Sequence, residues 1–372
     1  MTDIALVLAW LVLAHLLADF VLQNDWIAIN KGTGGRRGWS ALLVHGIHVA
    51  VCLLPAAFAY GPRGVAYMAI IAASHVLVDR WKVVATRRAD AAAQAQARLR
   101  IQVAGATPPS GLGAAWTPWP GLLFLADQVL HVTIALVGWL VLLEDVPIST
   151  PFADLANAVF RNWDRTAVHA AILTGVVLVS LFILNTRAAY YFVLALVSPR
   201  EVANPAPDPT AGPAAPAAAT GYTVRMGPLV ATVEPGVAGP VRAGRAPEPA
   251  VAATAGSPPP GSTPAATTPT ASAPAAAMTP GLFVPPGVSV PVGAPARIGA
   301  TIGALERLLI VVLLLTGAEA AVGFVIAAKT IARFKQLDDR GFAEYYLLGT
   351  LASVSVAIVT ALIAQAALRT LG

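Results

Sequence analysis

The sequence predicts an all-α, polytopic integral membrane protein, a helical bundle of about seven transmembrane helices with a disordered Pro/Ala-rich linker. Hydrophobic residues make up 57% of the 372 residues and charged residues only 12%, and the mean hydropathy is +0.70. Soluble domains carry about a quarter charged residues, so this composition excludes a soluble globule and requires a surface that faces lipid.

Apolar stretches of roughly 20 residues, long enough to cross a hydrocarbon core of about 30 Å, recur along the chain. They cover residues 4–22, 39–60, 64–84, 121–143, 167–186, 303–328 and 343–367. The first stretch has no basic region before it, which predicts an uncleaved helix rather than a signal peptide. The single cysteine, Cys52, excludes a disulfide framework. The net charge of +5 includes no basic run with interleaved aromatic residues, so no nucleic-acid partner is expected.

Residues 199–300 differ from the rest of the chain because they contain 22 of its 30 prolines. Such a Pro/Ala/Thr-rich composition buries too little apolar area to offset chain entropy, and we expect a disordered linker whose protein partner is unknown. The predicted organisation is a His/Asp transmembrane bundle of about five spans (1–198), the linker (199–300) and a C-terminal transmembrane hairpin (301–372). Residues 86–103 are expected to form a polar, Ala-rich helix outside the bilayer.

Lysine and arginine counts suggest an orientation. With alternating loops on alternating faces, one face holds 15 basic residues and the other 7, which makes the first face cytoplasmic. The same assignment places Lys329, Arg333, Lys335 and Arg340 on the outer face, against the rule. A re-entrant or additional crossing at residues 188–197 is an alternative that would move these residues to the basic face.

Each of the first four spans contributes a pair of ionisable residues at helical spacing, so that both members lie on one face of the helix. The pairs are His15 with Asp19, His45 with His48, His75 with Asp79, and Asp127 with His131. His precedes Asp in spans 1 and 3, whereas Asp precedes His in span 4, which runs the opposite way. Antiparallel packing therefore brings all three carboxylates to one depth, with His15, His48, His75 and His131 about one turn deeper.

Ionisable groups at this depth are costly unless they are paired or functional. Neutral imidazole and carboxylate are ligands of zinc, manganese and iron, so the sequence predicts a divalent-metal site. The predicted ligands are His15, His45, His48, His75, Asp127 and His131. Asp19 and Asp79 are the candidate general bases for metal-activated water. A proton or ion pathway, a bis-His haem and structural hydrogen bonding remain as alternatives.

Basic residues follow the carboxylates near the same face. Lys31 follows span 1 and Lys82 follows Asp79, and both are candidate contacts to the anionic headgroup of a membrane lipid. Positive-inside anchoring is the simpler alternative explanation for these residues.

Several motifs resemble a bacterial membrane family known as domain of unknown function 3307. They are HLLADFVLQNDWIAINK (15–31), HGIH (45–48), SHVLVDRWK (74–82) and FLADQVLH (124–131), and the segments LERLLI, AAKTIARFK and AEYYLLGTLASVSVA near the C-terminus are similar to a companion segment of longer members. The resemblance implies a multi-pass protein of the bacterial inner membrane with no established activity. More distantly, the HxxxD and DxxxH motifs are similar to those of membrane-bound metal-dependent hydrolases. The hypothesis is a metal-dependent hydrolase of a lipid or lipid-linked phosphate. The alternatives are a divalent-metal or proton transporter and a non-catalytic scaffold.

Overall fold

The structure is a computed structural model that describes residues 4–104, 112–202, 222–226, 229–233, 244–245 and 294–371. Most of the expected linker (199–300) lies outside the described residues. The chain divides into two compact units, and every described helix belongs to the first, which comprises residues 1–203 and 278–372. The second unit, residues 204–277, contains three short antiparallel strands in the order β1-β2-β3: β1 (Tyr222–Met226), β2 (Leu229–Val233) and β3 (Gly244–Arg245).

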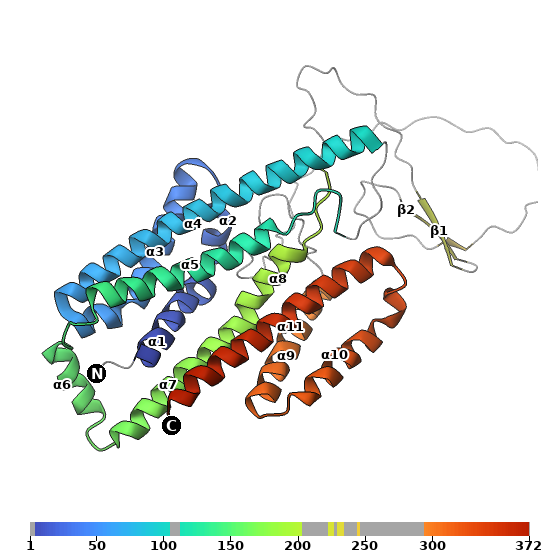
Figure 1. Cartoon of the computed structure of the whole chain (residues 1–372). Helices are drawn as coiled ribbons and strands as arrows, with labels where there is room; N and C mark the ends of the chain where they lie inside the picture. The colour runs from blue at the N-terminus through green and yellow to red at the C-terminus, as the bar shows by residue number, and fades with distance from the viewer. Residues whose placement is uncertain are drawn as a thin grey trace, which may run out of the picture. The chain divides into compact units, whose positions relative to one another are not determined.

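The N-terminal part of the helical unit is an antiparallel group of long helices (Figure 1). It contains α1 (Ile4–Leu16), the π-helix η1 (Leu17–Leu22), α2 (Asp25–Lys31), α3 (Gly35–Cys52), α4 (Leu54–Ala104) and α5 (Trp119–Leu142). Asn24 caps α2 by accepting a hydrogen bond from the Ile27 amide at 3.0 Å. The chain bends inside α4 at Gly61, whose φ of 59° favours glycine, and Pro62 follows it. Beyond this bend α4 runs unbroken to Ala104 and includes the polar helix expected at 86–103.

The chain then forms the short helix α6 (Thr150–Val159) and a long helical segment. This segment joins α7 (Arg165–Ile183), the π-helix η2 (Leu184–Ala188) and α8 (Ala189–Val197) over 33 residues. Residues 188–197 therefore continue the fifth predicted span instead of forming a re-entrant segment.

The predicted sixth span at 303–328 is wrong as a single helix. The structure has two helices there, α9 (Ala294–Leu315) and α10 (Ala320–Ala332), separated by a turn at Gly317, whose φ is 76°. Lys329 Nζ of α10 lies 2.5 Å from Glu306 Oε2 of α9, so the two helices run back along each other. The 3₁₀ helix η3 (Phe334–Gln336), α11 (Arg340–Leu368) and the 3₁₀ helix η4 (Arg369–Leu371) follow.

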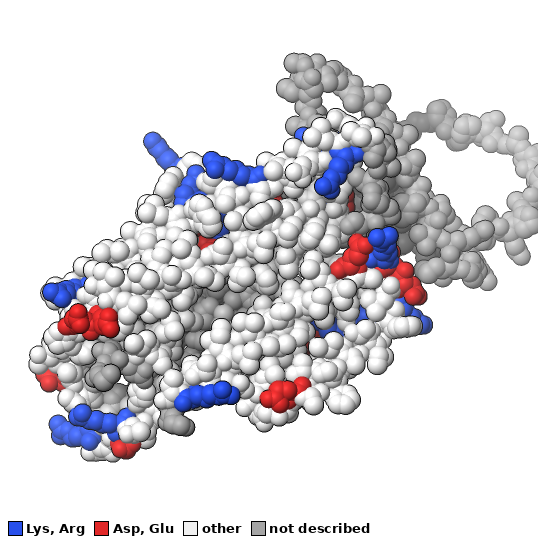
Figure 2. Space-filling model, viewed as in Figure 1, with Lys and Arg blue, Asp and Glu red and all other residues white. Residues whose placement is uncertain are grey.

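In the part of the chain that the structure describes, five helical segments are long and apolar enough to cross a membrane: Ile4–Leu22, Leu54–Val103, Trp119–Leu142, Arg165–Val197 and Arg340–Leu368. In Figure 2 most charged side chains gather toward the two ends of the helical unit, and a broad uncharged band separates them. The chain is thus an all-α membrane protein. Two of the seven predicted spans are not among these five segments. Residues 39–60 lie mainly in the 18-residue helix α3, and residues 303–328 are divided at Gly317.

Two apolar clusters fix the positions of these helices. The first fills the space between α1, α3, α4 and α5 and includes Tyr67, Trp139 and Leu143, which are almost fully buried. The second joins α7 to α9, α10 and α11 around Leu173, Ile310 and Ala357. The N-terminal helices and the C-terminal helices thus share one packed unit.

Candidate metal centre

Ionisable side chains from α1, η1, α3, α4 and α5 meet inside the N-terminal bundle. His15 comes from α1, Asp19 from η1, His45 from α3, His75 and Asp79 from α4, and Asp127 and His131 from α5. All seven residues are at most 9% exposed. Three overlapping groups among them have ligand atoms within 4.8 Å of one another: His15, Asp19, His75 and His131; His45, His75 and Asp79; and Asp79, Asp127 and His131.

The tightest arrangement is a triangle of three ligand atoms. Asp19 Oδ1 lies 3.2 Å from His45 Nε2 and 3.1 Å from His75 Nε2, and the two imidazole nitrogens are 3.1 Å apart. Around a metal ion with bonds of about 2.0–2.1 Å, neighbouring ligand atoms are about 2.9 Å apart in octahedral and about 3.3 Å apart in tetrahedral geometry. The observed edges fall between these values. Two histidines and one carboxylate are also a known ligand set for divalent metals.

Gln128 orients a further histidine beside this triangle. Its Nε2 donates to Asp127 Oδ2 at 3.0 Å and to Asp19 Oδ2 at 3.5 Å, so its Oε1 is left to accept from His15 Nε2 at 3.0 Å. His15 Nε2 therefore carries the proton, and the neutral ring keeps its lone pair on Nδ1, which lies 3.9 Å from Asp19 Oδ1. The hydrogen bonds of Gln128 thus leave the Nδ1 lone pair of His15 on the side of Asp19, where it could bind a metal ion.

His131 is oriented in a similar way. Its Nε2 lies 3.3 Å from the His75 carbonyl oxygen, which can only accept, so Nδ1 carries the lone pair of the neutral ring. This Nδ1 lies 3.8 Å from Asp127 Oδ1. The ring stacks on that of His75 with centroids 3.7 Å apart and an interplanar angle of 13°.

The two lysines pair with two of the three carboxylates. Lys31 Nζ lies 3.1 Å from Asp79 Oδ2, and Lys82 Nζ lies 2.5 Å from Asp127 Oδ2 and 3.6 Å from Asp79 Oδ1. These contacts form an alternating ladder Lys31–Asp79–Lys82–Asp127. Asp19 instead contacts the imidazoles of His15, His45 and His75 and the side-chain amide of Gln128.

Charge counting shows why this arrangement favours a cation. With neutral histidines, three carboxylates and two ammonium groups leave one negative charge inside the bundle. In addition, Asp19 Oδ1, Asp79 Oδ1 and Asp127 Oδ1 are buried and accept no hydrogen bond. A buried polar atom without a partner costs about 1–3 kcal/mol. A cation bound at Asp19 would balance the charge and give Asp19 Oδ1 a partner.

The structure separates the two histidines of α3. His45 lies on the buried face of the helix and joins the triangle, whereas His48 is only half-buried, belongs to none of the three ligand groups, and leaves its Nδ1 without a hydrogen bond. The sequence predicts His48 at the same depth as the other histidines, but in the structure His45 lies beside them. The buried stripe of α3 includes Leu42, His45 and Val49, and a residue three positions after His45 falls at its edge.

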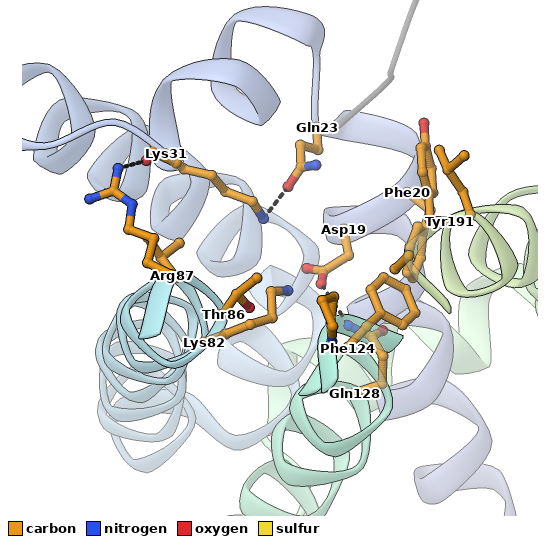
Figure 3. Close-up of a pocket in the computed structure, with 15 residues that line it drawn as sticks. Asp19, Phe20, Gln23, Lys31, Lys82, Thr86, Arg87, Phe124, Gln128 and Tyr191 are labelled. Carbon is orange, nitrogen blue, oxygen red and sulfur yellow. Dashed lines mark hydrogen bonds between the residues drawn. The ribbon is translucent and has the colours of Figure 1, made fainter. Parts of the chain in front are cut away.

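A pocket leads to the centre from one side (Figure 3). It encloses about 850 Å³ of space, part of it open to the outside. Lys31, Lys82 and Arg87 line one side, and Phe20, Phe124 and Tyr191 line the other, while Asp19 and Gln128 also face the pocket. The Arg87 guanidinium donates to the Gly32 carbonyl, and Lys31 donates to Gln23 Oε1 at 2.7 Å.

The opposite side of the centre is closed by apolar packing. The first cluster contains Leu11 before His15, Val49 after His45, and Ile71 before His75, with Ala135 and Trp139 after His131. In antiparallel helices all these positions lie beyond the histidines, on the side away from the pocket. Within the described residues the centre is therefore the floor of a blind pocket.

Sequence reasoning missed Gln23, Gln128 and the full role of the lysines. Gln128 is adjacent to Asp127 in the motif FLADQVLH. An uncharged polar residue beside a predicted buried acid indicates a hydrogen-bonding role near the site. The sequence predicts Lys31 and Lys82 as headgroup contacts, whereas the structure buries them to 3% and 7% exposure against carboxylates. Both lysines still line the pocket.

The ladder generates a stability prediction. Lys82→Met leaves Asp127 buried without its cation, and we expect the free energy of unfolding to fall by about 3–5 kcal/mol. The double variant Lys82→Met, Asp127→Leu removes both charges and should recover most of that loss. Reversible denaturation in detergent, followed by circular dichroism, measures both. Arg340→Met is the matched control, because it breaks the exposed Arg340–Glu344 pair and should cost less than about 1 kcal/mol. A double variant as unstable as Lys82→Met would contradict the ladder.

Comparison with known proteins gives one match. Residues 7–156 match the sequence model of the family described as Protein of unknown function (DUF3307). No curated protein and no solved structure matches the chain. The matched residues include every histidine, carboxylate and lysine of the centre. Over residues 7–156 the chain is therefore similar to the DUF3307 family.

Proposed function

We propose that this protein binds one divalent metal ion inside the membrane and uses it to hydrolyse a lipid or lipid-linked phosphate. The observation that carries the proposal is the triangle of Asp19 Oδ1, His45 Nε2 and His75 Nε2, with edges of 3.1–3.2 Å. Asp19 is the natural anionic ligand because its Oδ1 contacts the Nε2 atoms of both His45 and His75. In the ladder, lysines are the counter-ions of Asp79 and Asp127. The Lys82 ammonium lies between these two carboxylates and occupies the place of a second metal ion that could bridge them. This favours a single ion.

Hydrolysis is the chemistry that such an ion supplies most directly. A divalent metal with an open position lowers the pKa of bound water to about 7 and polarises a phosphoryl oxygen. Asp79, 3.6 Å from His45 Nε2 through its Oδ2, is the candidate to accept the proton of that water. The HxxxD and DxxxH motifs, similar to those of membrane-bound metal-dependent hydrolases, agree with this proposal.

The pocket supports an amphiphilic substrate. Its basic side can receive an anionic headgroup, since arginine and lysine bind phosphate through charge-assisted hydrogen bonds. Its aromatic side can receive the beginning of a hydrocarbon chain. Arg87 is the best candidate for the headgroup contact, because Lys31 and Lys82 already neutralise carboxylates. Membrane lipid is thus the proposed partner.

Transport fits the structure less well. A transporter requires polar groups that continue to the opposite face, whereas Leu11, Ile71, Trp139 and their neighbours close that side with apolar packing. A scaffold without catalysis does not account for so many buried ionisable groups, each of which is costly in hydrocarbon.

We further propose a multi-pass location in the bacterial inner membrane with the pocket open to the cytoplasm. The α9–α10 turn at Gly317 supports this orientation. It returns the chain to its starting side, so Lys329, Arg333, Lys335 and Arg340 join the basic face. The basic face then holds 19 lysine and arginine residues instead of 15, and the opposite face holds 3 instead of 7. This distribution agrees with the positive-inside rule.

Metal analysis tests the binding step. Protein purified in detergent, exposed to zinc, manganese or ferrous iron and then desalted, should retain about one equivalent of one of these metals, as measured by inductively coupled plasma mass spectrometry. Asp19→Asn, His45→Ala and His75→Ala should each remove most of it. His48→Ala is the control on the same helix and should leave the stoichiometry unchanged. Negligible metal in the wild type, or an equal loss in His48→Ala, contradicts the proposed centre.

Phosphate release tests the chemistry. The metal-loaded protein should release inorganic phosphate from vesicles that contain phosphatidic acid or a polyprenyl phosphate, and it should not act on water-soluble glycerol phosphate. Asp19→Asn should abolish release because it removes the anionic ligand. Arg87→Gln should raise KM roughly tenfold with little change in kcat, the pattern of lost ground-state binding. Metal binding without phosphate release, together with metal uptake into proteoliposomes, would favour a transporter.

Cysteine labelling tests the orientation. In a Cys52→Ala background, Gln102→Cys at the end of α4 and Gln336→Cys in η3 should react with an impermeant maleimide from the same side of the membrane. Asp145→Cys, between α5 and α6, should react from the other side. All three positions are exposed. Labelling of Gln336→Cys from the side of Asp145→Cys would show that the α9–α10 hairpin does not return the chain to the basic face.

A further inference from the structure

We propose that Arg187 and Arg307 are positioning residues that fix Asp19 through a hydrogen-bonded relay from the C-terminal helices. The proposal rests on the function proposed above insofar as Asp19 is a metal ligand. Both arginines lie outside residues 7–156, which match the family. The relay would explain what helices α9 and α11 contribute to a centre built wholly from α1, η1, α3, α4 and α5.

The first link joins the two π-helices. Arg187 of η2 donates through Nη1 to the carbonyl oxygen of Phe20 in η1 at 2.7 Å. Phe20 directly follows Asp19, and η1 ends at Leu22, where Gln23 leaves helical geometry with ψ of 110°. A carbonyl in the last turn of a helix has no donor within that helix. The Arg187 guanidinium supplies this donor, and its positive charge also suits the negative end of the helix.

The second link joins η2 to α9. Arg307 donates through Nε to the carbonyl oxygen of Asn185 at 2.6 Å and through Nη1 to Ser353 Oγ of α11 at 3.1 Å. Asn185 and Arg187 belong to the same five-residue π-helix. A π turn contains one more residue than an α turn and occurs often at functional sites. Asn185 also donates through Nδ2 to Thr360 Oγ1 of α11 at 3.1 Å, so η2 is tied to both C-terminal helices.

The burial of Arg307 is costly, which argues against an incidental role. Arg307 is only 4% exposed, and its Nη2 atom has no hydrogen bond. Among the described residues the structure gives it no ion pair with a carboxylate. An uncompensated cation in a low-dielectric interior destabilises the fold by several kcal/mol, and an apolar residue of similar size would pack without that cost. Its bond to the Asn185 carbonyl is the feature that an apolar residue cannot replace.

The relay also sets the aromatic side of the pocket. The ring of Phe20 stacks on Tyr191 of α8 with centroids 6.1 Å apart and an interplanar angle of 20°. The bond from Arg187 to the Phe20 backbone therefore holds η1 and the η2–α8 segment together next to Asp19. Metal–ligand distances in proteins fall within about 0.2 Å of their standard values, so a shift of η1 that moves Asp19 should weaken metal binding.

The test compares Arg187→Met and Arg307→Met with the wild type and with Gln365→Met. Gln365 Nε2 donates to the Leu314 carbonyl at 2.7 Å, so the control removes a similar bond between α11 and α9 that is not part of the relay. Zinc or manganese affinity in detergent is measured by competition with a chromophoric chelator. Hydrogen–deuterium exchange of residues 17–22 is measured on the same metal-free samples, with a peptide from α5 as reference.

Both arginine variants should weaken metal affinity about 10–100-fold, the usual effect of losing a residue that orients a ligand, and should accelerate exchange in residues 17–22. Arg307→Lys, which keeps a donor, should recover part of both effects, and Gln365→Met should change neither. Unchanged affinity and exchange in the arginine variants, or equal effects in Gln365→Met, overturn the relay. If the wild type binds no metal, the proposed function fails, while the exchange rates still decide the relay.

Discussion

The cost of charge in a low-dielectric interior governs how this bundle is built. Three carboxylates are buried together inside the N-terminal bundle, and none can remain ionised there without a cation or hydrogen-bond donors. Lys31 and Lys82 meet two of these needs by bonding to Asp79 and Asp127. Since both lysines are committed to those acids, the imidazoles gather around Asp19. The position of the ammonium groups thus decides which carboxylate is left for a metal ion.

The inverted order of the His and Asp pairs was sufficient to predict that four helices share one buried layer of ionisable groups. It could not select between His45 and His48, because both lie within one turn and the choice depends on how α3 is rotated against α4. That rotation is set by packing, including the close approach of Gly46 to Val76, where a Cβ would lie 2.6 Å from the valine side chain. The role of Gln128 could not be predicted for a related reason. It depends on hydrogen bonds to His15 and Asp19 of another helical segment as well as to the neighbouring Asp127.

Hydropathy predicts where the apolar segments lie, but it does not predict where the chain turns back within such a segment. Residues 303–328 are apolar throughout and read as one crossing, yet Gly317 adopts a left-handed conformation and divides them into α9 and α10. A window average does not register one backbone angle. The ion pair between Lys329 and Glu306 is visible only after the turn has been placed. The π-helices η1 and η2 were equally hidden, since an extra residue in a helical turn leaves the apolar pattern almost unchanged.

Helix α8 supplies Tyr191, Leu194 and Ala195 to the pocket, although it lies beyond residues 7–156. The ligand atoms and the surface that would receive a hydrocarbon chain therefore belong to separate stretches of the polypeptide. If the proposed lipid substrate is correct, substitutions in α8 would change the length or branching of the accepted chain while the imidazoles and Asp19 stay as they are. Under the proposed function, substrate selectivity and metal binding could thus evolve independently.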